Sequence, residues 1–425
     1  MSDSFATRRQ QFARAMRSST GSPPAAVFAG GHEVIRNGDV PYEFRQGSTF
    51  QYLTGFDEPD AVAVLRPGTD EPYVLFVRPR DPRRAVWDGP RAGVEGATQL
   101  FGADAAYPID ELPERLPRLL ARASTLYFAL GSDEVVEQVV RRGPSAIEAV
   151  IDPSPTLARM RLRKSSDEVA LLQRAVDITG DGLAAAIGAT RPGMYEYEVK
   201  GVLEAEYRRN GSPRDGFPAI VASGANSCVL HYPLSYDRIN DGDLLLIDTG
   251  AEIGSYGADV TRTFPANGSF TKAQREVYEI VLAAHDAAID VVAPGVRFED
   301  VHLAALKVVV AGLRRLGVLK GRTDKLIRDG AHAPYFMHGT SHWLGLDVHD
   351  VGSYREGDES IALRPGMVLT VEPGLYFGPG AKAPRRLRNI GIRIEDDILV
   401  TRSGRRNLSA AIPTDPDELE TMVGP

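Results

Sequence analysis

Cysteine is almost missing from this sequence. Cys228 is the single cysteine among 425 residues, so the chain cannot form an intrachain disulfide and suits a reducing compartment. The first 16 residues are polar and hold no apolar run long enough for a signal-peptide core or a membrane span. We therefore expect a cytoplasmic protein.

Basic residues are fewer than acidic residues. Lysine and arginine number 49 against 57 aspartates and glutamates, which gives a formal net charge of −8. Non-specific binding to nucleic acid or to an anionic membrane needs clustered basic residues, so we expect neither partner. The sequence also lacks short repeats and low-complexity tracts, which excludes solenoid and linker architectures. A small or peptidic substrate fits this composition better.

The length of 425 residues exceeds what one ordinary core accommodates and allows two domains. A boundary is expected near Asp152–Lys164, where Pro153 and Pro155 interrupt regular structure. We place an N-terminal domain at residues 1–160 and a second domain at residues 161–425. The composition, 43% hydrophobic and 25% charged, is typical of soluble globular domains.

The N-terminal domain combines short apolar runs with turn residues, which is an α/β pattern. Strands are expected at Ala61–Leu65, Tyr73–Val77 and Thr125–Leu130, and a helix at Asp110–Ala123. The stretch Pro79–Gly102 is rich in proline, glycine and arginine without clear periodicity. We interpret it as an ordered loop with Trp87 at its centre.

The second domain begins with a well-marked helix. Ser165 and Glu168 have the spacing of a capping box, and apolar residues then recur on one helical face. Further helices are expected at Glu196–Arg209, Lys272–Val292 and Phe298–Leu316, and strands at Leu244–Thr249, Val368–Glu372 and Ile390–Val400.

Two acidic residues lie close together in this domain. Asp248 ends a buried-type strand, where it either caps the following turn or needs a compensating cation. Asp259 lies in the strand-like segment Tyr256–Phe264, and the connection Gly250–Gly257 can fold that segment back as a hairpin. Facing carboxylates repel, and proteins resolve this with a shared proton or with a divalent metal.

The segment His338–Asp350 is the strongest local signal, because it holds three histidines: His338, His342 and His349. Such clustering favours ligation or catalysis over a structural role. The spacing of His338 and His342 matches that of the zinc-protease helix. Gly339, however, stands where that motif needs glutamate, and glycines discourage a helix, so we reject this interpretation.

Two further carboxylates complete a set. Glu372 follows the apolar run Val368–Val371 and precedes a turn. Alternation places Arg393 and Glu395 on one strand face, although a surface ion pair would give the same pattern. Four carboxylates and one histidine form an oxygen-rich set that suits manganese, cobalt or zinc. Their number favours two ions about 3.5 Å apart over a single ion.

These residues resemble a known family. The order Asp248, Asp259, His342, Glu372, Glu395, with the His338–Asp350 segment, is similar to aminopeptidase P. This is the Xaa-Pro aminopeptidase branch of the metallopeptidases that share the pita-bread fold with methionine aminopeptidase and prolidase. The stretch Arg45–Pro59 also resembles the N-terminal domain of that family.

The resemblance implies a fold, a cofactor and a substrate. The fold would be an α/β N-terminal domain followed by an α+β pita-bread catalytic domain. The cofactor would be two divalent ions per chain, with manganese as the expected metal and cobalt or zinc as alternatives. Asp248 would bind one ion, Asp259 and Glu395 both ions, and His342 and Glu372 the other. The substrates would be peptides with proline second, and the protein would be a homo-oligomer, either a dimer or a tetramer.

The resemblance also implies roles in catalysis. Glu372 would shuttle a proton from water. His231 and His349 would donate hydrogen bonds to the substrate carbonyl and the oxyanion, and His338 would line the proline pocket. Arg393 would orient a metal ligand. Two N-terminal residues would help to close the cleft and contact substrate: Asp39 and Trp87.

Three alternative interpretations share some of these features. Prolidase, which cleaves Xaa-Pro dipeptides, has a similar site, but the segment Ser341–Asp347 resembles aminopeptidase P more closely. Pita-bread domains also occur as non-catalytic binding modules, yet those typically lose metal ligands. A nucleophilic pair of Cys228 and His231 lacks a third, orienting group.

Overall fold

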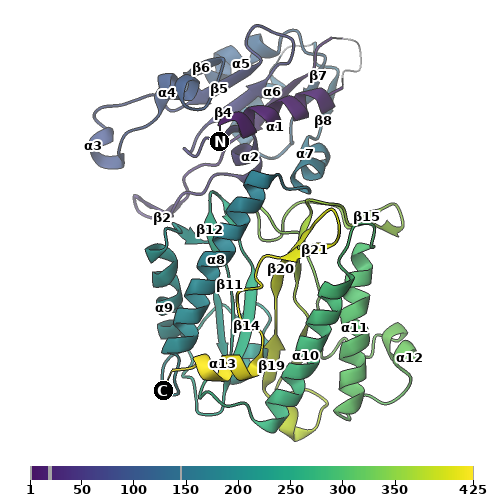
Figure 1. Cartoon of the computed structure of the whole chain (residues 1–425). Helices are drawn as coiled ribbons and strands as arrows, with labels where there is room; N and C mark the ends of the chain where they lie inside the picture. The colour runs from purple at the N-terminus through teal and green to yellow at the C-terminus, as the bar shows by residue number, and fades with distance from the viewer. Residues whose placement is uncertain (1, 18–21, 144–145, 425) are drawn as a thin grey trace. The chain divides into compact units, whose positions relative to one another are not determined.

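The computed structural model of the chain describes residues 2–17, 22–143 and 146–424 (Figure 1). The chain divides into two compact units, Met1–Met160 and Arg161–Pro425. Within the described ranges, no helix combines the length and the apolar character needed to cross a membrane.

The first unit is built on a mixed sheet. Its strands are β1 (Ala25–Ala29), β4 (Val62–Leu65), β5 (Tyr73–Val77), β6 (Ala105–Pro108), β7 (Thr125–Tyr127) and β8 (Ala149–Ile151). Their order is β6-β5-β4-β1-β7-β8, with antiparallel pairing of β4 to both β1 and β5 and parallel pairing elsewhere. A separate hairpin joins β2 (Ile35–Asn37) and β3 (Val40–Pro41). The expected α/β pattern is confirmed.

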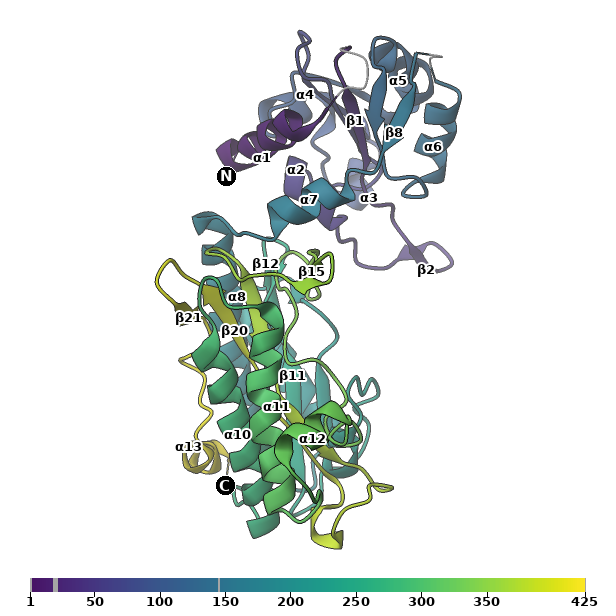
Figure 2. The same ribbon diagram turned by 90° about the vertical axis from the view of Figure 1, so that its right-hand side faces the viewer.

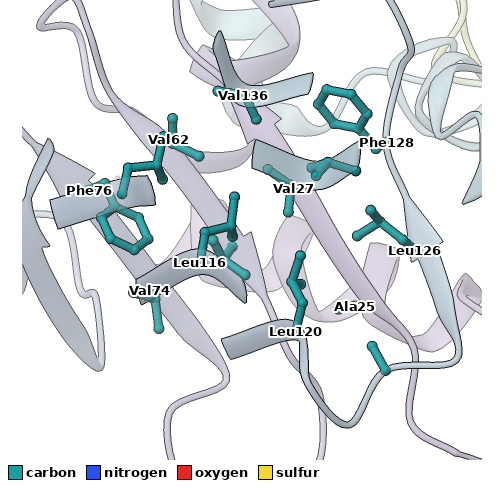
Figure 3. Close-up of a cluster of buried hydrophobic side chains, with 14 residues drawn as sticks. Ala25, Val27, Val62, Val74, Phe76, Leu116, Leu120, Leu126, Phe128 and Val136 are labelled. Carbon is teal, nitrogen blue, oxygen red and sulfur yellow. The ribbon is translucent and has the colours of Figure 1, made fainter. Parts of the chain in front are cut away.

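Helices complete this unit: α1 (Ser2–Ala15), α2 (Ser48–Thr54), α3 (Ala85–Asp88), α4 (Gly93–Gln99), α5 (Leu112–Leu120), α6 (Glu134–Arg141) and α7 (Ser154–Arg161), with a 3-10 turn η1 (Ile109–Glu111). The core joins strand residues to residues of α5 and α6 (Figure 3): Val27, Val62, Val74, Phe76, Leu116, Leu120 and Val136. Burial of these side chains stabilises the unit by about 1.5–3 kcal/mol each.

Two local expectations for this unit are wrong. The stretch Pro79–Gly102 contains α3 and α4 rather than a loop alone. The start of α4 is stabilised from outside the stretch, because the Ala92 N–H donates to Oε1 of Glu58 at 2.6 Å. Local periodicity does not reveal such a cap. The predicted strand Thr125–Leu130 is also shorter, ending at Tyr127.

The second unit holds two pairs of long helices: α8 (Ser166–Ala189) with α9 (Glu196–Arg209), and α10 (Lys272–Val291) with α11 (Phe298–Arg315). The pairs lie on opposite sides of the strands in Figure 1, and Figure 2 shows α10 and α11 side by side. The capping box is confirmed, since Ser165 Oγ accepts from the Glu168 N–H and Glu168 Oε2 accepts from the Ser165 N–H. Shorter helices are α12 (Thr323–Arg328) and α13 (Pro416–Met422).

Between the helix pairs, strands form several small antiparallel sheets. The first half contributes β10 (Ile220–Ser223), β11 (Leu244–Thr249) and β14 (Val260–Pro265), and beside them β9 (Arg214–Asp215), β12 (Ala251–Ile253) and β13 (Tyr256–Gly257). The second half contributes β17 (Val368–Val371), β20 (Asp396–Val400) and β21 (Arg405–Asn407), and beside them β18 (Gly374–Phe377) paired with β19 (Ile390–Arg393). A hairpin of β15 (Arg355–Glu356) and β16 (Glu359–Ser360) precedes β17.

Two strands expected to be continuous are interrupted. The segment Tyr256–Phe264 breaks between β13 and β14, and the segment Ile390–Val400 breaks between β19 and β20. Asp259 and Glu395 lie in these breaks. The breaks are held by contacts between the halves: the Asp259 N–H donates to Oδ2 of Asp397 at 3.1 Å, and the Glu395 N–H donates to the Thr261 carbonyl at 3.1 Å.

Glycine is required where the first break meets β11. A Cβ on Gly250 would lie 1.7 Å from the backbone oxygen of Ala258, so the backbone would have to move.

We expect Gly250→Ala to lower the free energy of unfolding by about 3 kcal/mol or more. Urea denaturation measures this. Gly201→Ala in α9 is the control, because a Cβ there meets nothing within 4 Å in the described chain. This variant should gain about 0.5–1 kcal/mol. Equal stability of the two variants would contradict the close contact.

Candidate metal centre

The structure brings the five predicted metal ligands together on one cavity of about 580 Å³. Asp248 belongs to β11, and Asp259 and Glu395 lie in the two strand breaks. Glu372 directly follows β17. His342 lies beside β17, where its backbone N–H donates to the Thr370 hydroxyl at 3.1 Å. The strand ends of both halves of the unit therefore converge on one place.

The distances between these side chains suit a divalent cation. His342 Nε2 lies 3.2 Å from Oδ2 of Asp259 and 3.6 Å from Oε1 of Glu372. Ligand atoms of Asp259, His342 and Glu395 all lie within 4.8 Å of one another. One ion can therefore contact all three. Their role as ligands stays a prediction, as does the division of ligands between two ions.

The tautomer of His342 agrees with ligation. Its Nδ1 lies 3.1 Å from the backbone oxygen of Trp343. A carbonyl oxygen can only accept, so Nδ1 carries the hydrogen, and in the neutral ring Nε2 keeps its lone pair. That lone pair faces Asp259 and Glu372. Histidines that bind metals commonly use this arrangement.

Charge density is the main electrostatic feature of the cavity. Asp259 is 4% exposed and Glu395 1% exposed. Burial and neighbouring carboxylates raise the pKa of Asp259 well above its ordinary value, and burial together with Asp248 raises the pKa of Glu395 to about 7. Burial and Glu395 also raise the pKa of Glu372. The site favours a bound cation, because a cation lets these groups ionise.

An unsatisfied atom points to the same conclusion. Oδ2 of Asp248 accepts a hydrogen bond from Nη2 of Arg393. Its other oxygen, Oδ1, is buried and has no hydrogen-bond partner among the described residues. Buried acceptors are nearly always paired with a donor, a water or an ion. The donor set and this free oxygen together fit a metal.

Hydrogen bonds link Arg393 to the predicted proline pocket. Arg393 donates from Nη1 to the Tyr376 hydroxyl at 3.0 Å and from Nε to the Thr261 hydroxyl at 3.1 Å. The Tyr376 hydroxyl lies 2.8 Å from Nε2 of His338, whose Nδ1 lies 2.7 Å from the Gly339 oxygen. Burial and Arg393 lower the pKa of His338 to about 4, so this ring is neutral near pH 7.

Thr261 and Tyr376 were missed by sequence analysis. The Thr261 hydroxyl donates to Oε2 of Glu395 at 2.6 Å. Tyr376 belongs to β18, which pairs with β19 so that Gly374 lies opposite Arg393. Neither residue lies in a motif, because their partners are distant in the sequence.

The other predicted histidines also line the cavity. The ring of His349 lies 4.4 Å from that of His342 at an angle of 83°. Burial lowers the pKa of His349, which leaves this ring neutral. His231 is exposed at the wall of the cavity. Apolar walls accompany them: Phe217, Pro218, Ile220, Leu230 and Val348.

The remaining predicted residues lie elsewhere in the chain. Asp39 and Trp87 belong to the first unit; Asp39 is exposed, and Trp87 is 86% exposed. Their contact with substrate stays a prediction. Burial raises the pKa of Cys228 to about 11, so its thiol is protonated and a poor nucleophile.

Comparison with known proteins decides the family. Residues 170–402 match the model of metallopeptidase family M24, and residues 5–127 match the aminopeptidase P N-terminal domain. The chain belongs to metallopeptidase family M24. It is therefore a metal-dependent hydrolase by family, and the resemblance drawn from the sequence is confirmed.

Individual M24 relatives agree over the whole length. The Xaa-Pro aminopeptidase of Escherichia coli strain K12 is 43% identical over 99% of this chain and 97% of its own. The structure of E. coli aminopeptidase P with the inhibitor Pro-Leu aligns with a TM-score of 0.95 at 42% identity, covering 99% of this chain and 98% of that one. For the Pseudomonas aeruginosa aminopeptidase PepP the TM-score is 0.94 at 41% identity, with the same coverage. The expected pita-bread fold is confirmed.

Raised carboxyl pKa values predict how the metal-free M24 site depends on pH. The ordinary glutamate pKa is 4.5, and that of folded Glu395 is about 7. Between these two pH values, Glu395 is protonated to a greater extent in the folded protein than in the unfolded chain. The stability that the folded protein gains by holding this proton is therefore complete below that pH range. It is lost as the pH rises through the range.

We expect the metal-free Glu395→Gln variant to gain thermal stability over the metal-free wild type as pH rises from about 5 to about 7.5. Comparing the two proteins at each pH removes the contribution of histidines that titrate in the same range. Differential scanning calorimetry with a chelator present measures the difference. A Tm difference that does not change with pH would contradict the burial of ionised carboxylates.

Proposed function

We propose that this chain is an Xaa-Pro aminopeptidase, which releases the N-terminal residue from peptides with proline second. One observation carries the proposal: four carboxylates and His342 converge on a cavity whose wall also presents three further histidines. The E. coli relative at 43% identity bears this name. The E. coli structural relative binds Pro-Leu, a dipeptide that begins with proline.

The proposed cofactor is two divalent ions, manganese first, with cobalt or zinc as substitutes. Oxygen ligands outnumber nitrogen, as expected for a hard cation. An E. coli aminopeptidase P of similar fold exists in a zinc-substituted form. We assign Asp248 to one ion, Asp259 and Glu395 to both, and His342 and Glu372 to the other. When bound, such ions supply an activated water and polarise the scissile carbonyl.

Glu372 is assigned the proton transfer. Its side chain is 18% exposed, whereas that of Asp259 is 6% exposed, so Glu372 is the more accessible of the two beside His342. A carboxylate at this edge can take a proton from water and deliver it to the leaving amine of proline. Arg393 holds Asp248 in place through their hydrogen bond.

The three wall histidines differ in what they can offer a substrate. His338 uses one ring nitrogen with Tyr376 and the other with the Gly339 oxygen. It therefore presents its ring to the cavity, which suits packing against proline. His231 and His349 keep N–H groups for the substrate carbonyl and the oxyanion. Proline lacks an N–H and has a fixed φ, so a shaped apolar pocket recognises it better than a hydrogen bond does.

We also propose a cytoplasmic homo-oligomer, a dimer or a tetramer, in which Asp39 and Trp87 help to close the substrate cleft. The support is the unusual exposure of the Trp87 indole, at 86%. Large apolar side chains left in solvent are common at contacts with another chain or a ligand. Sedimentation analysis of the purified protein tests the assembly.

His349→Ala separates catalysis from metal binding. It removes a proposed hydrogen-bond donor to the transition state but none of the five proposed ligands. We expect kcat/KM to fall by about two to three orders of magnitude with the metal content unchanged. His332→Ala is the control, because the His332 ring does not line this cavity. This variant should keep near-normal activity. Loss of metal from His349→Ala, or wild-type activity, would show that the assigned role is wrong.

Peptide length distinguishes an aminopeptidase from a prolidase. An aminopeptidase must leave room beyond the proline, whereas a prolidase holds the dipeptide carboxylate there. With manganese, we expect Ala-Pro-Ala to be hydrolysed faster than Ala-Pro, and Ala-Ala-Ala to be a poor substrate. Release of free alanine measures the rates. A tenfold preference in kcat/KM for the dipeptide, about 1.4 kcal/mol, would make the protein a prolidase.

A further inference from the structure

The segment between β10 and β11 forms part of the cavity wall without being a regular element. After the 3-10 turn η2 (Gly224–Cys228), it carries His231, Tyr232 and Pro233 to the cavity. His231 is exposed, so packing of its own ring does not fix its position. The position of His231 therefore depends on how the rest of the segment is held.

One carboxylate binds both ends of the segment. Glu196, the first residue of α9, is 0% exposed. Its Oε1 accepts from the Ser223 N–H at 2.7 Å, the Ser223 hydroxyl at 2.8 Å and Nδ2 of Asn226 at 3.0 Å. Its Oε2 accepts from the Asp237 N–H at 3.1 Å. Ser223 precedes His231, and Asp237 follows it.

Further contacts strengthen this connection. Burial, followed by the nearby Glu196 carboxylate, raises the pKa of Tyr232 to about 12, so its hydroxyl stays protonated. The Tyr232 ring packs in a buried cluster with Ile220 and Leu246. Asn226 also donates to Oδ2 of Asp237 at 2.8 Å. The residue next to His231 is thus held by packing, and the two ends of the segment are bonded to each other as well as to Glu196.

The chemistry of Glu196 matches a holding role. A buried carboxylate is costly unless donors compensate it. Within the described part of the chain, the hydrogen bonds found for the Glu196 side chain come from neutral donors of the 223–237 segment, and no ion pair to it is found. We infer that Glu196 is a positioning residue for His231, holding the segment that carries this histidine against the substrate. The inference rests on the proposed function for the role of His231.

Glu196→Gln tests this inference, because the amide NH2 cannot accept the hydrogen bonds that one carboxylate oxygen accepts. We expect kcat to fall about tenfold or more, as for losing a charged hydrogen bond, with KM changed less and metal content unchanged. Glu198→Gln is the matched control. Glu198 lies in the same turn of α9, is exposed, and accepts from the Tyr195 N–H rather than from the segment. This control should stay within about twofold of wild type.

A double-mutant cycle separates positioning from general stability. If Glu196 acts through His231, then Glu196→Gln should cost less than about threefold in the His231→Ala background. An equal loss in both backgrounds would overturn the inference. Should Glu196→Gln not fold, Asn226→Ala removes one donor from the segment and should lower kcat in the same direction. A folded Asn226→Ala variant with unchanged kcat would count against the inference.

Amide hydrogen exchange gives a readout that does not depend on activity. We expect residues 223–237 to exchange faster in Glu196→Gln than in the wild type or in Glu198→Gln. Unchanged exchange would overturn the inference. If the wild type hydrolyses no Xaa-Pro peptide, the proposed function fails, and the exchange measurement still decides whether Glu196 holds this segment.

Discussion

Repulsion between carboxylates is the constraint on which the rest of the catalytic unit depends. Asp248, Asp259, Glu372 and Glu395 share one cavity, and burial with mutual repulsion raises the pKa values of three of them. Arg393 contacts Asp248 through a charged hydrogen bond. A single guanidinium cannot balance four carboxylates, and divalent ions can. This excess of negative charge agrees with the membership of the chain in a metallopeptidase family.

The fold holds these groups together at the ends of strands and in breaks between strands. Asp248 and Glu372 end strands of the two halves of the unit, and Asp259 and Glu395 lie in strand breaks that are hydrogen-bonded across the halves. Buried Arg262 adds to this connection, because it donates to the backbone oxygen of Glu395. Separating the halves would therefore disrupt four ligands at once.

The side of the cavity lined by histidines and apolar residues is organised differently. The neutral rings of His338 and His349 and the apolar wall leave a pocket with little charge beside the acidic centre. His231 comes from an irregular segment, whose ends are joined through buried Glu196. The acidic centre is thus held by strands, while the segment that carries His231 is held by side-chain hydrogen bonds.

The sequence by itself determined what depends on neighbours along the chain. The capping box of Ser165 and Glu168 needs residues three apart, and Asp248 and Glu372 follow apolar runs that mark their strands. The order of the five acidic and histidine residues was sufficient for the family. Tertiary structure alone decided the strand breaks at Asp259 and Glu395, the cap that Glu58 gives α4, and the hydrogen bonds of Thr261, Tyr376 and Glu196. Each of these depends on a hydrogen bond between residues far apart in the sequence, and local periodicity carries no information about such partners.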